Sequence, residues 1–99
     1  MSYDFHITRA EFWPESEQSP IERREWEAVA DGHSELLQAG FFDWNDIGRQ
    51  PVYAISGEVI SFSWRIGRVD ISGIITDRVM GIAEGLASQL NAAVVGDDE

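Results

Sequence analysis

The two histidines are the side chains of this chain best suited to acid–base or metal chemistry. His6 is expected on the polar face of a strand, and His33 just after the end of a helix. No sequence spacing relates either one to the other or to a nucleophile, so we interpret both as isolated surface or capping residues. The chain has no cysteine, which excludes disulfides, zinc–thiolate sites and thiol catalysis.

The segment that begins at Asp43 partly matches a calcium-binding loop. Asp43, Asn45 and Gly48 occupy the first, third and sixth positions of such a loop. Its fifth position is Ile47 and its twelfth is Ala54, where calcium needs an oxygen ligand and a bidentate Glu. The sequence therefore predicts no metal site and no cofactor.

Carboxylates and glycines give no sign of an enzyme. The 18 Asp and Glu residues are so numerous that any pair says little about acid–base chemistry. No Gly-x-Ser-x-Gly sequence, phosphate-binding loop or dinucleotide fingerprint occurs. We expect a protein without catalytic residues, although a deep pocket lined by Tyr53, Trp64 and a titratable group would favour a small-molecule or enzymatic site.

Aromatic residues beside acidic ones form the first candidate for a partner-binding site. Large rings next to charges on a loop are typical of binding hot spots. The alternative is that these rings close one end of the core, because a small domain needs large apolar groups. The residues concerned are Phe41, Phe42, Asp43, Trp44 and Asp46.

Two further surfaces are candidates. Acidic residues crowd the first predicted helix and its flanks, where Glu22 and Glu25 are expected to contact a partner; a solvated helix face is the alternative. The other surface is the uncovered face of the predicted sheet. Its polar residues are Ser61, Ser63, Arg65, Asp70 and Ser72.

Alternation and capping signals outline the first part of the chain. Residues 3–10 alternate apolar and polar side chains, which predicts a half-buried strand. Residues 11–18 contain a proline and three glutamates, which favours a loop. The sequence SPIE at 19–22 is typical of a helix start with a capping box, so a helix is expected over about residues 20–31.

The middle of the chain is less regular. Residues 33–51 fit neither the helical nor the strand period, and we expect a short helical turn at 34–38 followed by an irregular loop. Residues 52–75 predict a meander of three strands. Gly67-Arg68 is predicted as a two-residue type II′ turn within it.

A second helix is expected to follow Thr76 or Asp77, either of which can cap it. Its apolar residues repeat on one side, namely Val79, Ile82, Ala83, Leu86 and Leu90. Gly81 and Gly85 lie four apart within this helix, which suggests close packing against the sheet. Residues 92–95 are predicted to form the last strand.

These elements give the order β-α-β-β-β-α-β in a single domain spanning residues 1–99, of which 96–99 form an acidic tail. The fold class is α+β, with one mostly antiparallel sheet and both helices packed on one face. Serines and charges alternate with apolar residues through 61–72, which predicts that the other face meets solvent.

Charge restricts the kinds of partner. The net charge is −11, with no lysine among the seven basic residues. Such a surface repels nucleic acid and anionic lipid and attracts basic proteins. Residues 11–35 hold eight acids and two arginines, whereas 52–75 hold two of each. We therefore expect a basic partner to dock near the first helix.

Two absences bear on location. The first residues are neither basic nor apolar, unlike a signal peptide. No apolar run approaches the roughly 20 residues that a membrane span needs. We expect a cytoplasmic protein.

The opening segment Tyr3-Asp4-Phe5-His6-Ile7-Thr8-Arg9 resembles the start of a group of small acidic bacterial proteins of unassigned function. In that group such a strand precedes an acidic loop, a Trp-containing helix and a sheet. Residues 19–26 and 82–98 resemble the same group. Proteins of this kind are similar to the immunity proteins of polymorphic toxin systems, and the resemblance implies a specific inhibitor without catalytic residues.

We therefore expect an immunity protein that binds a cognate bacterial toxin, with a basic nuclease-like domain as its target, and covers the toxin's active site. The alternative is a nucleic-acid mimic, such as a phage-encoded inhibitor of a DNA-binding enzyme, with carboxylates spaced like phosphates along one surface. Neither role needs a cofactor, a nucleic acid or a membrane. The sequence leaves the oligomeric state open.

Overall fold

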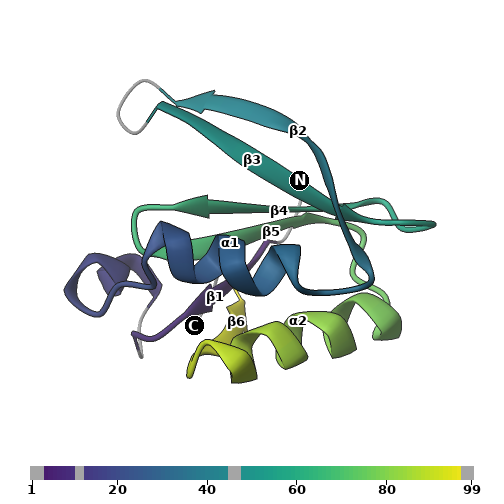
Figure 1. Cartoon of the computed structure of the whole chain (residues 1–99). Helices are drawn as coiled ribbons and strands as arrows, with labels where there is room; N and C mark the ends of the chain where they lie inside the picture. The colour runs from purple at the N-terminus through teal and green to yellow at the C-terminus, as the bar shows by residue number, and fades with distance from the viewer. Residues whose placement is uncertain (1–3, 11–12, 45–47, 97–99) are drawn as a thin grey trace.

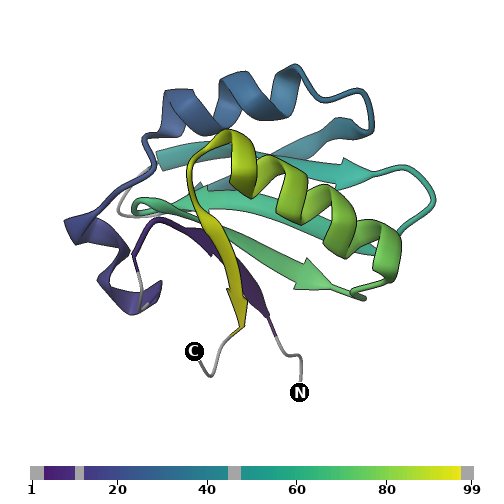
Figure 2. The same ribbon diagram turned by 90° about the horizontal axis from the view of Figure 1, so that it is seen from below.

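The computed structural model describes residues 4–10, 13–44 and 48–96. They form a six-stranded antiparallel sheet, and both helices lie on the same face of it (Figures 1 and 2). The α+β class and the order of the predicted elements are confirmed, with one additional strand. The elements are β1 (Phe5–Thr8), η1 (Trp13–Gln18), α1 (Arg23–Asp31), β2 (Leu36–Trp44), β3 (Gly48–Ile55), β4 (Ile60–Arg65), β5 (Arg68–Gly73), α2 (Asp77–Gln89) and β6 (Ala93–Gly96).

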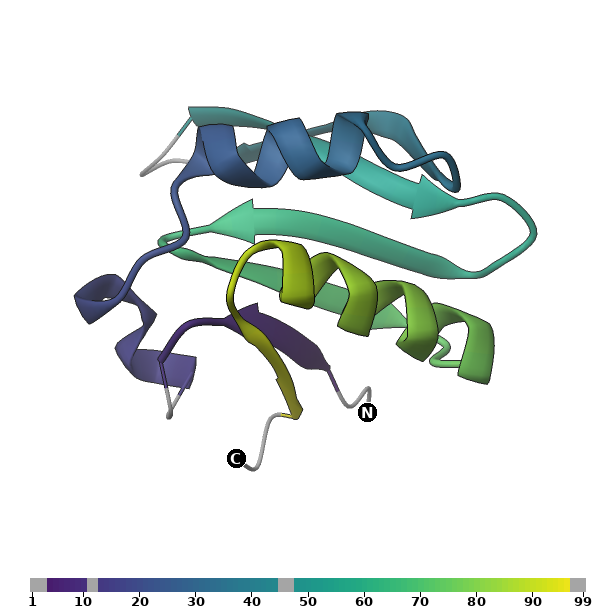
Figure 3. The same ribbon diagram turned by 60° about the horizontal axis from the view of Figure 1, so that its bottom comes forward.

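The strand order in the sheet is β2-β3-β4-β5-β1-β6. The first strand of the chain is therefore inserted between β5 and the last strand, and it pairs antiparallel with both. β2 and β6 form the two edges. Helix α1 contacts β2 and β4, whereas α2 contacts β1 and β6, so each helix covers about half of one face (Figure 3).

The core lies between the sheet and the helices. Trp26 of α1 is fully buried, stacks on Phe62 with ring centroids 6.2 Å apart, and forms a T-shaped pair with Tyr53 at 5.6 Å. On α2, Val79 and Leu86 are fully buried. Burying such side chains stabilises the fold by roughly 1.5–3 kcal/mol each, and this ties the two helices to the sheet.

Helix α1 begins three residues later than predicted, at Arg23. Tertiary contacts hold the preceding segment extended: Ile21 N–H donates to the Gly67 carbonyl at 2.9 Å, and Trp64 Nε1 donates to the Ile21 carbonyl at 2.7 Å. The capping box is therefore built on Glu22 rather than on Ser19. Residues 13–18, predicted as loop, form the 3-10 helix η1.

The prediction of a helical turn and irregular loop over residues 33–51 was wrong. Residues 36–44 form β2, which pairs antiparallel with β3. The pairing register shifts between Gln38 and Gly40, where φ is +152° at the glycine. This bulge interrupts the period of two, so Gln38 and Phe41 lie on the same face although they are three residues apart.

The turn between β4 and β5 is centred on Ile66 and Gly67, not on Gly67 and Arg68. Arg65 and Arg68 are the paired residues on either side of it. Both central residues have positive φ, 48° and 82°, as in a type I′ turn. A Cβ on Gly67 would lie 2.8 Å from the Ser16 carbonyl oxygen, so glycine is needed here for close approach as well as for conformation.

Helix α2 begins as predicted, with the Thr76 hydroxyl accepting a hydrogen bond from Val79 N–H at 3.2 Å. The expected packing of Gly81 and Gly85 against the sheet was wrong. Both are exposed, and a Cβ built on either one meets nothing within 4 Å. They lie on the solvent side of the helix because Ile82, Ala83 and Leu86 occupy its inner side.

Candidate interaction surface

The β2–β3 hairpin extends beyond the rest of the sheet. β3 pairs with β4 at Val52 and Tyr53, whereas its first half, from Gly48 to Pro51, pairs with β2. Figure 1 shows the outer half of this hairpin rising away from β4 toward its tip. A two-stranded ribbon is marginally stable by itself, so side-chain contacts across the hairpin matter for its order.

Four of the predicted contact residues lie in this hairpin. Phe41 and Asp43 are exposed in β2, opposite Pro51 and Arg49. The Arg49 guanidinium lies 5.6 Å from the Phe41 ring centroid, and its Nε donates to Asp43 Oδ1 at 3.1 Å. The surface thus already holds one arginine between a ring and a carboxylate.

The other aromatic residues of the predicted site belong to the same strand. Phe42 and Trp44 pair with Gln50 and Gly48 through the backbone. Asp46 lies outside the described residues. The predicted site is therefore an edge strand with ordered pairing, not an irregular loop.

Glu25 is engaged within the fold. Arg9 donates from both terminal nitrogens to its carboxylate, at 2.7 and 3.2 Å, and from Nε to the Leu90 carbonyl at 2.8 Å. The hydrogen bonds from Arg9, and one from the backbone of Glu22, hold the pKa of Glu25 below its usual value. Arg9 thus joins the end of β1, the start of α1 and the end of α2.

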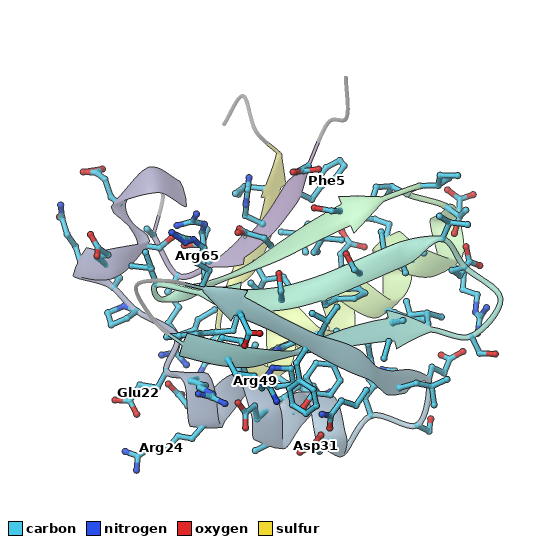
Figure 4. All side chains as sticks on the ribbon, turned by 90° about the horizontal axis from the view of Figure 1, so that it is seen from above. Phe5, Glu22, Arg24, Asp31, Arg49 and Arg65 are labelled. Carbon is cyan, nitrogen blue, oxygen red and sulfur yellow. The ribbon has the colours of Figure 1, made fainter. Side chains whose placement is uncertain are left out.

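Glu22 has a different environment from Glu25. It is the N-cap of α1, and its exposed carboxylate accepts from Arg24 Nε at 3.0 Å. Figure 4 shows Glu22 and Arg24 at the outer side of the helix, away from the sheet. Both predicted acidic residues therefore help to shape the start of α1, whether or not a partner contacts them.

A line of charged residues on α1 runs beside Tyr53 and the hairpin. Arg23, Glu27 and Asp31 are spaced by four and share one side of the helix, and Arg23 pairs with Glu27. The Tyr53 hydroxyl donates to Asp31 Oδ1 at 2.8 Å. Burial, together with the Asp31 carboxylate, raises the pKa of Tyr53 well above its usual value.

The arginines interact with other groups of the same chain. Six of the seven form an ion pair with a carboxylate, and the seventh, Arg65, also has an interaction within the chain. Arg78 joins the start of α2 to Glu35 and Glu58 at 3.1 and 3.4 Å. Within the described ranges the carboxylates that form no ion pair are Glu15, Glu17, Asp31, Asp77 and Glu84.

The uncovered sheet face carries the predicted serines and charges. Figure 4 looks onto this face, with the helices behind the sheet and Arg65 close to η1. The sequence missed one feature: His6 is only 4% exposed, and its Nδ1 lies 2.7 Å from Asp70 Oδ1. Arg68 Nε donates to the same oxygen at 2.8 Å. The interpretation of His6 as an isolated surface residue was therefore wrong.

The largest hollow described for this structure lies elsewhere than at the His6–Asp70 cluster, as its lining residues show. This shallow hollow of about 380 Å³ lies at the far end of β1, lined by Thr8 and Arg9 together with residues 91–93. Tyr53 and Trp64 do not line it, because the former binds Asp31 and the latter Ile21. Across the described residues no group of three potential metal ligands occurs, and no helix there is long and apolar enough to cross a membrane.

The sequence and the fold were compared with those of known proteins. The chain matches no protein-family model, no curated protein and no solved structure.

Proposed function

We propose that this protein is an immunity protein, which binds a basic bacterial toxin and covers its active site. The observation that carries the proposal is the distribution of charge. The net charge is −11, and the arginines are held by carboxylates and other groups of the same chain. In the part of the chain that the structure describes, the carboxylates that form no ion pair are all exposed. A basic protein is the partner that such a surface attracts.

Inhibition would follow from steric cover and electrostatic attraction. Carboxylates near α1 and the hairpin would pair with the basic cleft of the toxin, and the exposed ring of Phe41 would supply affinity. Long-range attraction would speed association, which matters for an inhibitor that must capture a toxin before it acts. This mechanism uses no catalytic group, metal or cofactor.

The nucleic-acid mimic is the less favoured role. On α1 the carboxylates alternate with arginines that bind them, as in the pairs Arg23–Glu27 and Arg24–Glu22. A phosphate-like surface needs unneutralised negative charges in a row, and these pairs interrupt such a row.

Growth rescue tests the proposal. The product of the gene adjacent to the one encoding this chain would be expressed alone and together with the chain. We expect the neighbouring product to stop growth, and the chain to restore growth and copurify in a stable complex. Toxicity that persists in spite of coexpression, or a neighbouring product without toxicity, would contradict the proposal.

A further inference from the structure

The two edge strands of the sheet, β2 and β6, differ in the length of backbone that is open to pairing with another chain. β6 has four residues, and short edge strands protect a protein against pairing with other chains. β2 has nine residues and pairs with β3 on one side. Its other side presents backbone N–H and C=O groups, which a further strand can bind.

Apart from the bulge between Gln38 and Gly40, the β2 edge lacks the usual protection against strand addition. It contains no proline and no basic residue, and its one charged residue, Asp43, binds Arg49 of the neighbouring strand. Leu37 and Phe41 are 53% and 58% exposed and face opposite sides of the sheet. A strand added here would contact one of these apolar side chains on each face.

The charges around this edge select the kind of strand. Glu27, Asp31, Glu35 and Asp43 border β2 from α1, from the preceding loop and from the strand itself. Three arginines, Arg23, Arg49 and Arg78, pair with three of them, and Asp31 binds only a hydroxyl. Exposed ion pairs of this kind are weak, so an incoming basic residue can replace one of these arginines or share its carboxylate.

Charge also decides between the two possible occupants. A second copy of this chain would bring another net charge of −11 to the same edge, and like charges facing each other are unfavourable. A basic segment from another protein meets complementary charge. The position of Arg49 between Phe41 and Asp43 shows how the hairpin accommodates a guanidinium.

We infer that β2 is the docking edge, and that an extended arginine- or lysine-bearing segment of the toxin adds to it as a seventh strand. This inference rests on the proposed function and specifies its interface. Backbone hydrogen bonds supply the affinity, while Leu37, Phe41 and the bordering carboxylates select the sequence of the segment. The bulge near Gly40 favours the outer half of β2 as the main contact.

Lysine substitutions test this inference. The full-length protein would carry Phe41→Lys, Leu37→Lys or, as a matched control, Val59→Lys, and its affinity for the purified product of the adjacent gene would be measured by calorimetry. Val59 is 69% exposed but lies outside β2, so the control changes the net charge equally. We expect each β2 variant to bind at least about 10-fold more weakly, as for a hot-spot residue, and Val59→Lys to bind like the wild type.

The outcomes separate the two proposals. If the wild type does not bind the adjacent product, the proposed function and the docking edge are both contradicted. If the wild type binds and the β2 variants bind equally well, only the docking edge is contradicted. Circular dichroism and melting curves show whether each variant is folded, and Phe41→Leu provides a milder change at the same site.

Sedimentation of the free protein tests the other occupant. At about 0.5 M salt, where surface charges are largely screened, we expect a monomer. A dimer that Phe41→Lys abolishes would show that the edge serves a second copy, and would overturn the inference.

Discussion

Arg9 and Glu25 are joined by two parallel hydrogen bonds, Nη2 to Oε2 at 2.7 Å and Nη1 to Oε1 at 3.2 Å. Arg9 also donates to the Pro20 and Leu90 carbonyls. This one side chain therefore connects the end of β1 to the start of α1 and to the end of α2, which are far apart in sequence. The pair links the start of α1 to the end of β1 and adds to the buried contacts of Trp26 that hold this helix on the sheet.

Glu25→Gln should therefore lower the melting temperature, whereas Glu84→Gln, at an exposed carboxylate without an ion pair among the described residues, should not. The effect should depend on pH. The folded pKa of Glu25 is lowered, so its contribution is present above the ordinary Glu pKa of about 4.3 and is lost as the pH falls through the folded value. Melting curves between neutral and acidic pH check this. A difference in melting temperature between wild type and Glu25→Gln that is the same at all pH values would contradict this prediction.

Tyr53 should make the protein sensitive to alkali. Its folded pKa is raised by burial and by Asp31, whereas an unfolded tyrosine ionises near pH 10. Its stabilising effect is therefore complete below about pH 10 and is lost as the pH rises toward the folded value. Tyrosinate absorbance and unfolding, followed together, should show Tyr53 ionising only with loss of structure. Tyr53→Phe should remove this sensitivity and cost about 1 kcal/mol at neutral pH through the lost hydrogen bond.

Gly81→Ala and Gly85→Ala should each stabilise the protein by about 0.5–1 kcal/mol, because both sites are helical and have open space for a methyl group. Denaturant unfolding measures the change. Gly67→Ala is the opposite case and should destabilise, since its Cβ would collide with backbone at Ser16. A loss of stability in Gly81→Ala or Gly85→Ala would contradict the prediction, because it would mean that these sites have no room for a methyl group.

The β4–β5 turn offers a further test. Ile66 has φ of 48°, a conformation that costs a β-branched residue roughly 1–2 kcal/mol and that asparagine tolerates far better. Ile66→Asn should therefore raise the unfolding free energy by up to about 1 kcal/mol, after the loss of some apolar contact. Denaturant unfolding with an unchanged m-value would confirm the reason; destabilisation would show that the isoleucine contact outweighs the backbone strain.

The sequence signals succeeded where one face of an element is buried. In β4, Ile60 and Phe62 alternate with Ser61 and Ser63, and in α2 the apolar residues repeat at the helical period. Both patterns follow directly from which side meets the core. The α+β class and the two helices could therefore be predicted before the structure was known.

β2 was missed for a physical reason. The strand lies at the edge of the sheet, and its outer half rises away from β4 and the core (Figure 1), so burial imposes little alternation on its residues. The bulge then places Gln38 and Phe41 on one face, so the residues of β2 do not follow the period of two that identifies a strand in a sequence. Its aromatic and acidic residues could be recognised as candidates, but their arrangement as an edge strand could not.

The contact between His6 and Asp70 could not be predicted from spacing, because 64 residues separate the two. It follows from the insertion of β1 beside β5, which places His6 directly opposite Asp70. Such an insertion depends on the tertiary arrangement, and the local pattern of neither strand encodes it. The engagement of Glu25 by Arg9 was missed for the same reason.

Backbone amide hydrogen exchange tests the central claim most directly, because an added strand must bind backbone groups of the β2 edge. Exchange would be mapped for the free protein and for its complex with the product of the adjacent gene. We predict strong new protection within residues 36–44, with little change in β6 and on the outer side of α2. A complex that protects other elements and leaves the exchange of β2 unchanged would contradict the claim.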